Sequence, residues 1–146
     1  MKKTFNLILI VFLVFSMNGC SIPKVTVDIS SPIEFYSPVM SSVPGMPINV
    51  EVNVISDDTY EISIEMETDH GTILEWGSDM KVNDLGRSVT YHDGTRYWSP
   101  FEEAGLADSA EIDVKVTVKG NGFDSVVRTN VKIVKNADGM YIIKND

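Results

Sequence analysis

The side chains best suited to bind a ligand are concentrated in one short segment, residues 91–101. Four aromatic residues occur there, and a histidine, an aspartate and an arginine lie among them. Aromatic rings stack on sugars or insert into pockets of a partner, and Tyr, Trp and Arg dominate the energetics of protein interfaces. We therefore expect the binding residues to be Tyr91, Arg96, Tyr97 and Trp98.

The same segment also has a purely structural interpretation. Tyr97 and Trp98 are adjacent, and successive side chains of a strand point to opposite faces. One ring would then face the core while the other shields the edge of a strand. A second tryptophan, Trp76, ends another short apolar segment, and we expect its ring in the core.

Catalytic chemistry has little support in the sequence. There is no Gly-x-Ser-x-Gly nucleophile elbow and no glycine-rich phosphate-binding loop. Glu102 and Glu103 could form a pair of carboxylates beside Phe101, but nothing places a substrate there. We expect a protein that is not an enzyme, with a small hydrolase or metal-dependent enzyme as the alternative.

No metal ion or other cofactor is expected. Calcium takes oxygen ligands from converging loops, and the acidic turns lack the regular Asp-x-Asp-x-Asp-Gly spacing of a loop site. His70 and His92 are the only histidines and Cys20 is the only cysteine, so a zinc or copper site would lack ligands. The acidic residues that we expect to cap turns are Asp57, Asp58, Asp69, Asp79, Asp84 and Asp93.

The charge balance excludes one class of partner. The chain has 12 basic and 21 acidic residues, for a net charge of -9. Such a chain repels phosphate backbones, so we expect no nucleic-acid binding. It is also poorly suited to electrostatic adhesion to anionic lipid, so membrane attachment would need a separate anchor.

The N-terminal segment has the pattern of such an anchor. Lys2 and Lys3 precede an apolar run over residues 5–15, and Cys20 follows a glycine, which is typical of an export signal. This ending resembles the lipobox of bacterial lipoproteins. The resemblance implies that residues 1–19 are a signal peptide and that acylated Cys20 holds the protein on the cell membrane, facing the extracytoplasmic side. An uncleaved N-terminal anchor and a free structural thiol are the alternatives.

Downstream, strict alternation of apolar and polar residues predicts β-strands. The pattern runs through residues 48–54, 60–67 and 110–119 and returns over 123–134, and no segment shows sustained helical periodicity. We expect about seven to nine short antiparallel strands, each with one apolar face. Two sheets packed face to face would bury these apolar faces. We therefore expect an all-β sandwich. Its strand order stays open, because residues 48–55 could form a hairpin with 60–67 or pair elsewhere.

Two stretches resemble bacterial immunoglobulin-like and PKD-like domains. The first combines an alternating strand, an Asp/Gly corner and a strand that bears an aromatic residue, and the second is similar to the entry of strand F in immunoglobulin folds. Within the second stretch, residues 108–114, Ile112 stands at the tyrosine position and Val114 at the second-cysteine position, so the tyrosine corner and the inter-sheet disulfide are absent. The residues of the first stretch are Ile62, Ile64, Met66, Asp69, Gly71, Thr72, Ile73 and Trp76.

This resemblance implies an immunoglobulin-like β-sandwich over residues 47–146. Residues 20–46 would form the lipidated N-terminus, a tether and an edge strand. Such domains serve as spacers, adhesion modules or binders, and the fold alone does not choose among them. We expect a non-catalytic binding or adhesion module for a protein or a cell-wall glycan, held at the membrane by its lipid. The alternative is a structural envelope module without a ligand; the oligomeric state stays open.

Overall fold

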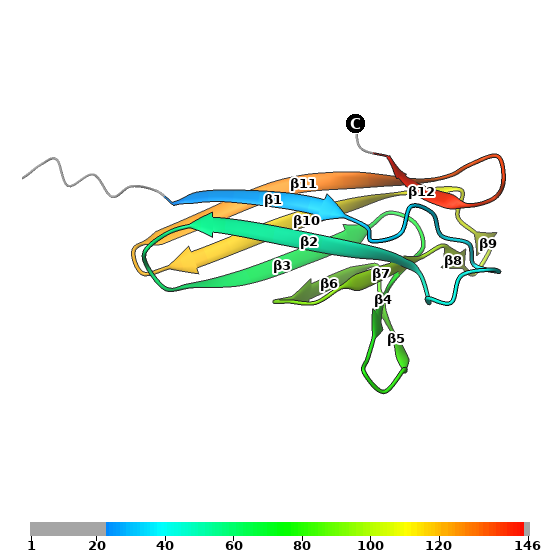
Figure 1. Cartoon of the computed structure of the whole chain (residues 1–146), viewed down its shortest axis with the longest axis horizontal. Helices are drawn as coiled ribbons and strands as arrows, with labels where there is room; N and C mark the ends of the chain where they lie inside the picture. The colour runs from blue at the N-terminus through cyan, green and yellow to red at the C-terminus, as the bar shows by residue number, and fades with distance from the viewer. Residues whose placement is uncertain (1–22, 145–146) are drawn as a thin grey trace, which may run out of the picture.

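The structure of the protein is a computed structural model that describes residues 23–144. Cys20 and the predicted signal peptide lie outside the described residues. Residues 23–144 form twelve β-strands and no α-helix (Figure 1), which confirms the prediction of an all-β chain. In this part of the chain there is no helix with the length and apolar character needed to cross a membrane.

Ten of the strands form two antiparallel sheets of five strands each. The first sheet has the order β1 (Lys24–Ser30), β2 (Met46–Ile55), β7 (Arg96–Ser99), β4 (Thr72–Trp76) and β5 (Val82–Gly86). The second has the order β12 (Tyr141–Lys144), β11 (Phe123–Lys135), β10 (Ser109–Gly120), β3 (Tyr60–Thr68) and β6 (Ser88–Tyr91). The remaining strands, β8 (Phe101–Glu102) and β9 (Gly105–Leu106), pair only with each other.

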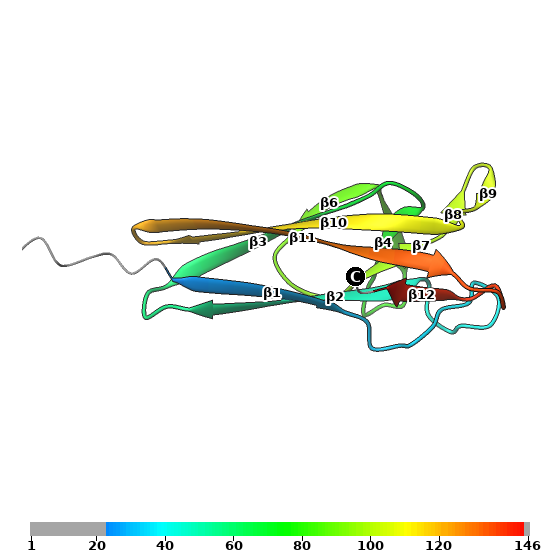
Figure 2. The same ribbon diagram turned by 90° about the horizontal axis from the view of Figure 1, so that it is seen from above.

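The two sheets pack face to face, in agreement with the predicted β-sandwich (Figure 2). The strands β2 and β3 follow each other in sequence but belong to different sheets, so residues 48–55 do not form a hairpin with 60–67. β2 pairs instead with β1, where Val52 lies opposite Val27, and β3 pairs with β10, where Ile64 lies opposite Val116. The apolar rows of the alternating strands thereby face one another across the core.

The core is centred on large side chains that both sheets contribute. Trp98 from the first sheet and Tyr141 from the second are each fully buried, and their rings meet edge to face with centroids 5.2 Å apart. Tyr36, in the connection between β1 and β2, adds a third ring 6.4 Å from Tyr141. Aliphatic side chains fill the rest of the centre: Ile48, Ile64, Ile73, Ile112, Val114, Val116, Val118 and Ile133.

The structure has more strands than the seven to nine expected, because the middle of the chain is divided into short pieces. Residues 77–106, which lie outside the alternating segments of the sequence, contain β5 to β9. Residues 101–106 form the β8–β9 hairpin. Gly105, with φ of 126°, adopts the backbone conformation that lets this hairpin reverse tightly.

The molecule is elongated, and its two ends differ (Figure 1). β1 begins at one end, beside the β2–β3 and β10–β11 turns, while the β8–β9 hairpin and the β11–β12 turn lie at the other. The β4–β5 hairpin projects sideways from the body. A chain held at its N-terminus would therefore present the β4–β5 side and the far end away from the point of attachment.

Candidate functional site

Two of the four predicted binding residues lie in the core. Trp98 is 0% exposed and Tyr91 is 4% exposed, so neither ring has surface available for a ligand. The structural interpretation therefore holds for Trp98, and these two side chains contribute packing rather than contact. A binding role stays a prediction for Tyr97 and Arg96, which are both partly exposed.

Trp98 is fixed in the core by hydrogen bonding and by close packing of the backbone. Its indole Nε1–H donates to the carbonyl oxygen of His70 at 2.8 Å, so the buried polar atom is satisfied. Gly71, with φ of 75°, lies directly against it, and a Cβ at Gly71 would come within 2.2 Å of the Ser99 oxygen and 2.8 Å of Trp98 Nε1. The Asp/Gly corner of the sequence, which contains Gly71, is thus the turn that packs against Trp98.

Trp76 is on the outside of the first sheet, which corrects the expectation that it belongs to the core. Leu74 and Tyr97 are cross-strand partners on the face opposite to Trp98, and Trp76 shares that face because it lies two residues from Leu74. The Trp76 and Tyr97 rings meet edge to face, with centroids 5.8 Å apart and planes at 77°. Both side chains are half-buried and keep an exposed part.

Arg96 on β7 of the first sheet contacts Tyr91 on β6 of the second sheet, inside the sandwich. Its guanidinium carbon lies 4.3 Å from the centroid of the Tyr91 ring, a cation–π contact, and its Nη2 lies 3.4 Å from Glu75 Oε1. Its Nη1 donates to the Thr95 carbonyl oxygen at 3.2 Å. The Arg96 side chain is only 12% exposed and its Nε–H has no hydrogen-bond partner in the structure, so one donor at this place is left unpaired.

These side chains border a surface depression that we call the aromatic hollow. It lies between the end of β4 and the β6–β7 loop, which carries the turn residues Asp93 and Gly94. Thr95 is held in place by a 2.8 Å hydrogen bond from its hydroxyl to Asn49 Oδ1 on β2. The residues that line the hollow are Glu75, Trp76, Gly77, Asp93, Gly94, Thr95, Arg96 and Tyr97.

The hollow has one apolar and one polar side. The rings of Trp76 and Tyr97 offer carbon surface and Asp93 offers acceptor oxygens, whereas Glu75 and Arg96 pair with each other. Tyr91, although buried, belongs to its support, and burial raises the pKa of its hydroxyl to about 12 against the opposing effect of Arg96. The tyrosine therefore stays protonated and neutral beneath the guanidinium at ordinary pH.

The predicted Glu102–Glu103 pair is not a pair of equivalent carboxylates. Glu102 Oε1 accepts hydrogen bonds from the Gly71 backbone N–H at 2.8 Å, from Arg87 Nη2 at 3.1 Å and from His70 Nδ1 at 3.3 Å. The Gly71 bond, with the neighbouring His70 and Arg87, lowers the pKa of the Glu102 carboxyl. Glu103 is exposed. Glu102 therefore stabilises, through these hydrogen bonds, the turn that packs against Trp98.

Several acidic turn residues cap the backbone, as expected from the sequence. Asp69 Oδ1 accepts from the Glu111 N–H at 2.8 Å, and Asp79 Oδ1 accepts from the Lys81 N–H at 3.2 Å. Asp84 Oδ1 accepts from the Thr72 hydroxyl and from the Gly86 N–H, and these bonds lower the pKa of its carboxyl. Within residues 23–144, no three His, Cys, Asp or Glu side chains are grouped so that they could hold a metal ion.

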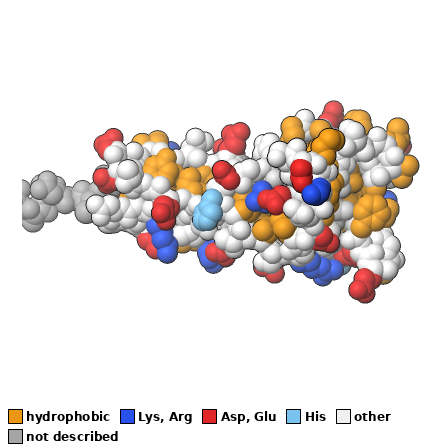
Figure 3. All heavy atoms as spheres, turned by 90° about the horizontal axis from the view of Figure 1, so that it is seen from below, with side chains coloured by type: hydrophobic (Ala, Val, Ile, Leu, Met, Phe, Trp, Pro, Cys, Tyr) orange, Lys and Arg blue, Asp and Glu red, His pale blue; other side chains and the backbone are white. Residues whose placement is uncertain are grey.

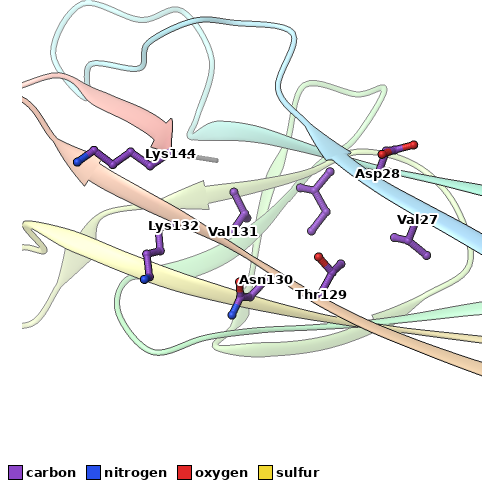
Figure 4. A pocket seen from close by; sticks show the side chains of 8 residues that line it. Val27, Asp28, Thr129, Asn130, Val131, Lys132 and Lys144 are labelled. Carbon is purple, nitrogen blue, oxygen red and sulfur yellow. The ribbon is translucent and has the colours of Figure 1, made fainter. Parts of the chain in front are cut away.

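A second depression, which we call the edge groove, lies between β1 and β11 on another side of the sandwich (Figure 4). It runs between the outermost strand of the first sheet and the second-outermost strand of the other. No feature of the sequence pointed to it, because it depends on which strands end up at the edges. The residues that line it are Val27, Asp28, Ile29, Thr129, Asn130, Val131, Lys132 and Lys144.

Figure 3 shows one face of the molecule, on which acidic and basic side chains are interspersed along the elongated part and apolar side chains gather mainly toward the end opposite the start of β1. Glu61, Glu65 and Glu67 are exposed on the outer face of β3, where Glu65 pairs with Lys115 Nζ at 2.8 Å. That row is a solvated strand face.

The apolar pattern of residues 72–76 limits which of their side chains can face the core. In residues 72–76 two adjacent residues, Ile73 and Leu74, are both apolar, so only one of them can face the core. Ile73 faces the core, and Trp76 therefore shares the outer face with Leu74.

Compared with known proteins, the chain matches no family model, no curated protein and no solved structure.

Proposed function

We propose that the protein is a lipid-anchored, extracytoplasmic module that binds a polysaccharide of the cell envelope without catalysing a reaction. The anchor rests on the resemblance of residues 1–20 to a lipoprotein signal, and the binding role rests on the aromatic hollow. We assign the sandwich to the immunoglobulin-like class, in which strand ends and loops hold binding residues on a rigid scaffold.

The observation that supports the proposal is that two partly exposed rings adjoin an exposed carboxylate, that of Asp93. The faces of a sugar ring carry C–H groups that pack on aromatic rings, and its rim carries hydroxyls that need donors and acceptors. Trp76 and Tyr97 provide the ring surface, and their edge-to-face contact at 5.8 Å fixes the orientation of each. Asp93 borders the same hollow and provides acceptor oxygens.

The charges favour a neutral glycan over an anionic polymer. Glu75 and Arg96 are paired at 3.4 Å, which leaves the carboxylate of Asp93 as the excess charge at the hollow. The chain as a whole carries -9, so a polymer rich in phosphate or carboxylate would be repelled. We therefore take the uncharged sugar rings of the cell wall as the ligand.

A sedimentation assay tests this proposal. Full-length protein in detergent is mixed with purified peptidoglycan from which anionic polymers have been stripped, and the bound fraction is measured over a range of protein concentrations. We expect the native protein to bind and Trp76→Ala to bind about five- to tenfold more weakly. Phe101→Ala is the matched control, because Phe101 is a 57% exposed ring outside the hollow.

The outcomes separate the two functional hypotheses. Weaker binding by Trp76→Ala with unchanged binding by Phe101→Ala supports recognition at the aromatic hollow. Absence of binding by the folded native protein contradicts the proposal and favours a structural envelope module. Equal losses in both variants would place recognition outside the hollow.

A further inference from the structure

The chain between the lipid and the folded part of the protein is short. If Cys20 carries the lipid, as the proposed function assumes, three residues separate it from β1, which begins at Lys24. An extended chain advances at most about 3.6 Å per residue, so the Cα atoms of Cys20 and Lys24 are at most about 14 Å apart. The end of the sandwich at which β1 begins is therefore held next to the bilayer.

Two turns lie beside the start of β1 at this end. Both ribbon views place the β2–β3 turn and the β10–β11 turn there (Figure 1, Figure 2). The strand register agrees, because Ile55, the last residue of β2, lies opposite Lys24. In the second sheet, Gly120 on β10 lies between Tyr60, the first residue of β3, and Phe123, the first residue of β11. A bilayer that holds the N-terminus would face these residues first.

This end of the sandwich exposes apolar and aromatic side chains. Ile55 is 71% exposed and Tyr60 is 41% exposed. Phe123 is half-buried, and its ring lies over Gly120, since a Cβ at Gly120 would come within 2.0 Å of Phe123 Cε1. Tyrosine is enriched at membrane–water boundaries, because its ring is apolar and its hydroxyl is polar. The end therefore has the side chains that suit the boundary between lipid headgroups and acyl chains.

The charged residues at this end limit how deeply it can enter a bilayer. Charged side chains are costly to place in hydrocarbon, so their positions must stay among the headgroups. Four acids and two lysines lie within two residues of the two turns or of the start of β1, so attraction to anionic lipid does not drive the contact. These charged residues are Lys24, Asp57, Asp58, Glu61, Lys119 and Asp124.

The far end of the molecule has an apolar turn of its own, but the predicted lipid is not there. Val39 and Met40 are 91% and 85% exposed in a turn that is closed by a 2.9 Å hydrogen bond from the Ser41 N–H to the Ser37 carbonyl oxygen. This turn belongs to the connection between β1 and β2, which extends toward the other end (Figure 1). Exposure alone therefore does not select the end that meets the membrane, whereas the position of the anchor does.

We propose that the end formed by Ile55, Tyr60 and Phe123 rests on the bilayer that holds the lipid anchor. Ile55 and the two rings reach the boundary between headgroups and acyl chains, and the acidic residues of the turns remain in water or among the headgroups. The acyl chains and this contact together fix the orientation of the sandwich, which the acyl chains alone would leave open. The long axis then points away from the membrane, and the aromatic hollow is held clear of the lipid. This contact depends on the anchor of the proposed function and not on glycan binding.

Amide NMR with a paramagnetic lipid tests the orientation. Isotope-labelled protein is purified from its membrane, the mass of its N-terminal peptide is measured, and the protein is placed in phosphatidylcholine nanodiscs. A small fraction of the lipid carries a gadolinium chelate on its headgroup. We expect the amide signals of residues 55–60 and 119–123 to broaden, and those of 37–41 and 77–80 to stay sharp. Partial replacement of the lipid by phosphatidylglycerol should reduce the broadening, because acids outnumber lysines at this end.

A matched pair of variants separates this contact from general stickiness of the surface. Ile55→Asp puts a charge at the proposed boundary and should reduce the broadening of residues 119–123, because the body is then held by the acyl chains alone. Val39→Asp makes the same kind of change at the far end, at a side chain that is even more exposed. It should leave the native pattern of broadening unchanged.

The outcomes distinguish this contact from the anchor on which it depends. In acylated protein, broadening that is strongest at residues 37–41, or equal at the two ends, overturns the contact and leaves the anchor intact. An N-terminal peptide without acyl chains overturns the anchor and the contact together, while the sedimentation assay still decides on the aromatic hollow. Should Ile55→Asp fail to fold, the pattern of broadening in the native protein settles the orientation.

Discussion

Trp76 and Tyr97 meet edge to face on the outer surface of the first sheet, with ring centroids 5.8 Å apart, although β5 and β6 separate β4 from β7 in the chain. Trp98, the next residue after Tyr97, points the other way and is fully buried. The two tryptophans of the chain therefore have opposite roles, one in the surface and one in the core. This contrast makes each of them a control for the other.

Trp98→Ala should destabilise the protein far more than Trp76→Ala. Removing a fully buried tryptophan costs about 3–5 kcal/mol through lost burial and the cavity that remains. Trp76 is only partly buried, so we expect its alanine variant to lose about 1 kcal/mol or slightly more. Urea unfolding followed by circular dichroism measures both values. Similar losses in the two variants would contradict the placement of the rings.

The loss of the indole hydrogen bond can be measured separately. Trp98→Phe keeps an aromatic ring but leaves the His70 carbonyl oxygen with one donor fewer, since the Thr68 hydroxyl also donates to it at 2.6 Å. We expect a smaller loss than in Trp98→Ala, about 2 kcal/mol, because the carbonyl keeps its second partner. A Trp98→Phe variant as unstable as Trp98→Ala would show that the hydrogen bond, not the packing, dominates.

Gly71→Ala should destabilise the protein more than Gly122→Ala does. Both glycines have positive φ, 75° and 95°, so each alanine suffers the same kind of backbone strain. A Cβ at Gly71 also comes within 2.2 Å of the Ser99 oxygen, whereas one at Gly122 meets nothing within 4 Å. The difference between the two unfolding free energies therefore reports the collision alone. Equal effects would mean that the turn yields without cost.

Glu102 should make the stability of the protein sensitive to acid. The Gly71 N–H, His70 and Arg87 lower the pKa of its carboxyl in the folded state. A lowered pKa means that the stabilisation is present above the unfolded value, about 4.3, and is lost as the pH falls through the folded value. Glu102→Gln should flatten the dependence of the urea midpoint on pH in this acidic range. Glu103→Gln, at an exposed neighbour, should leave the dependence unchanged.

Tyr91→Phe should be neutral or slightly stabilising at neutral pH. The Tyr91 hydroxyl is buried without a hydrogen-bond partner in the structure, and removal of such a group carries no loss of bonding. Because burial raises the pKa to about 12, the native protein should lose stability as the pH rises above the unfolded value of about 10. The phenylalanine variant should lose less over that range. A neutral-pH loss above about 1 kcal/mol would reveal a partner for the hydroxyl.

The sandwich could be predicted from sequence because residues 48–54, 60–67 and 110–119 alternate between apolar and polar without exception. Residues 110–119 and 60–67 read as strands with one apolar face, and they pair as β10 and β3. The order of strands could not be predicted, because alternation says which face of a strand is buried but not which strand lies beside it. The edge groove is a consequence of that order alone.

The candidate site could be predicted only in part. The segment around Tyr97 and Arg96 was found because its composition is unusual, but Trp98 lies in the core and Trp76 takes its place beside Tyr97. Which of two neighbouring aromatic residues faces the core cannot be assigned until the register with β4 is known. The ion pair of Arg96 with Glu75 depends on the same register and had no signal in the sequence.

The most direct test of the binding proposal uses the two indole N–H groups, which give one NMR signal each because the chain has only two tryptophans. The signals are assigned with Trp76→Phe, and full-length protein in detergent is titrated with soluble glycan fragments of peptidoglycan. We predict that the Trp76 signal shifts progressively with added glycan while the Trp98 signal stays in place. A folded protein in which neither signal moves, or in which only the Trp98 signal moves, would contradict glycan binding at the aromatic hollow.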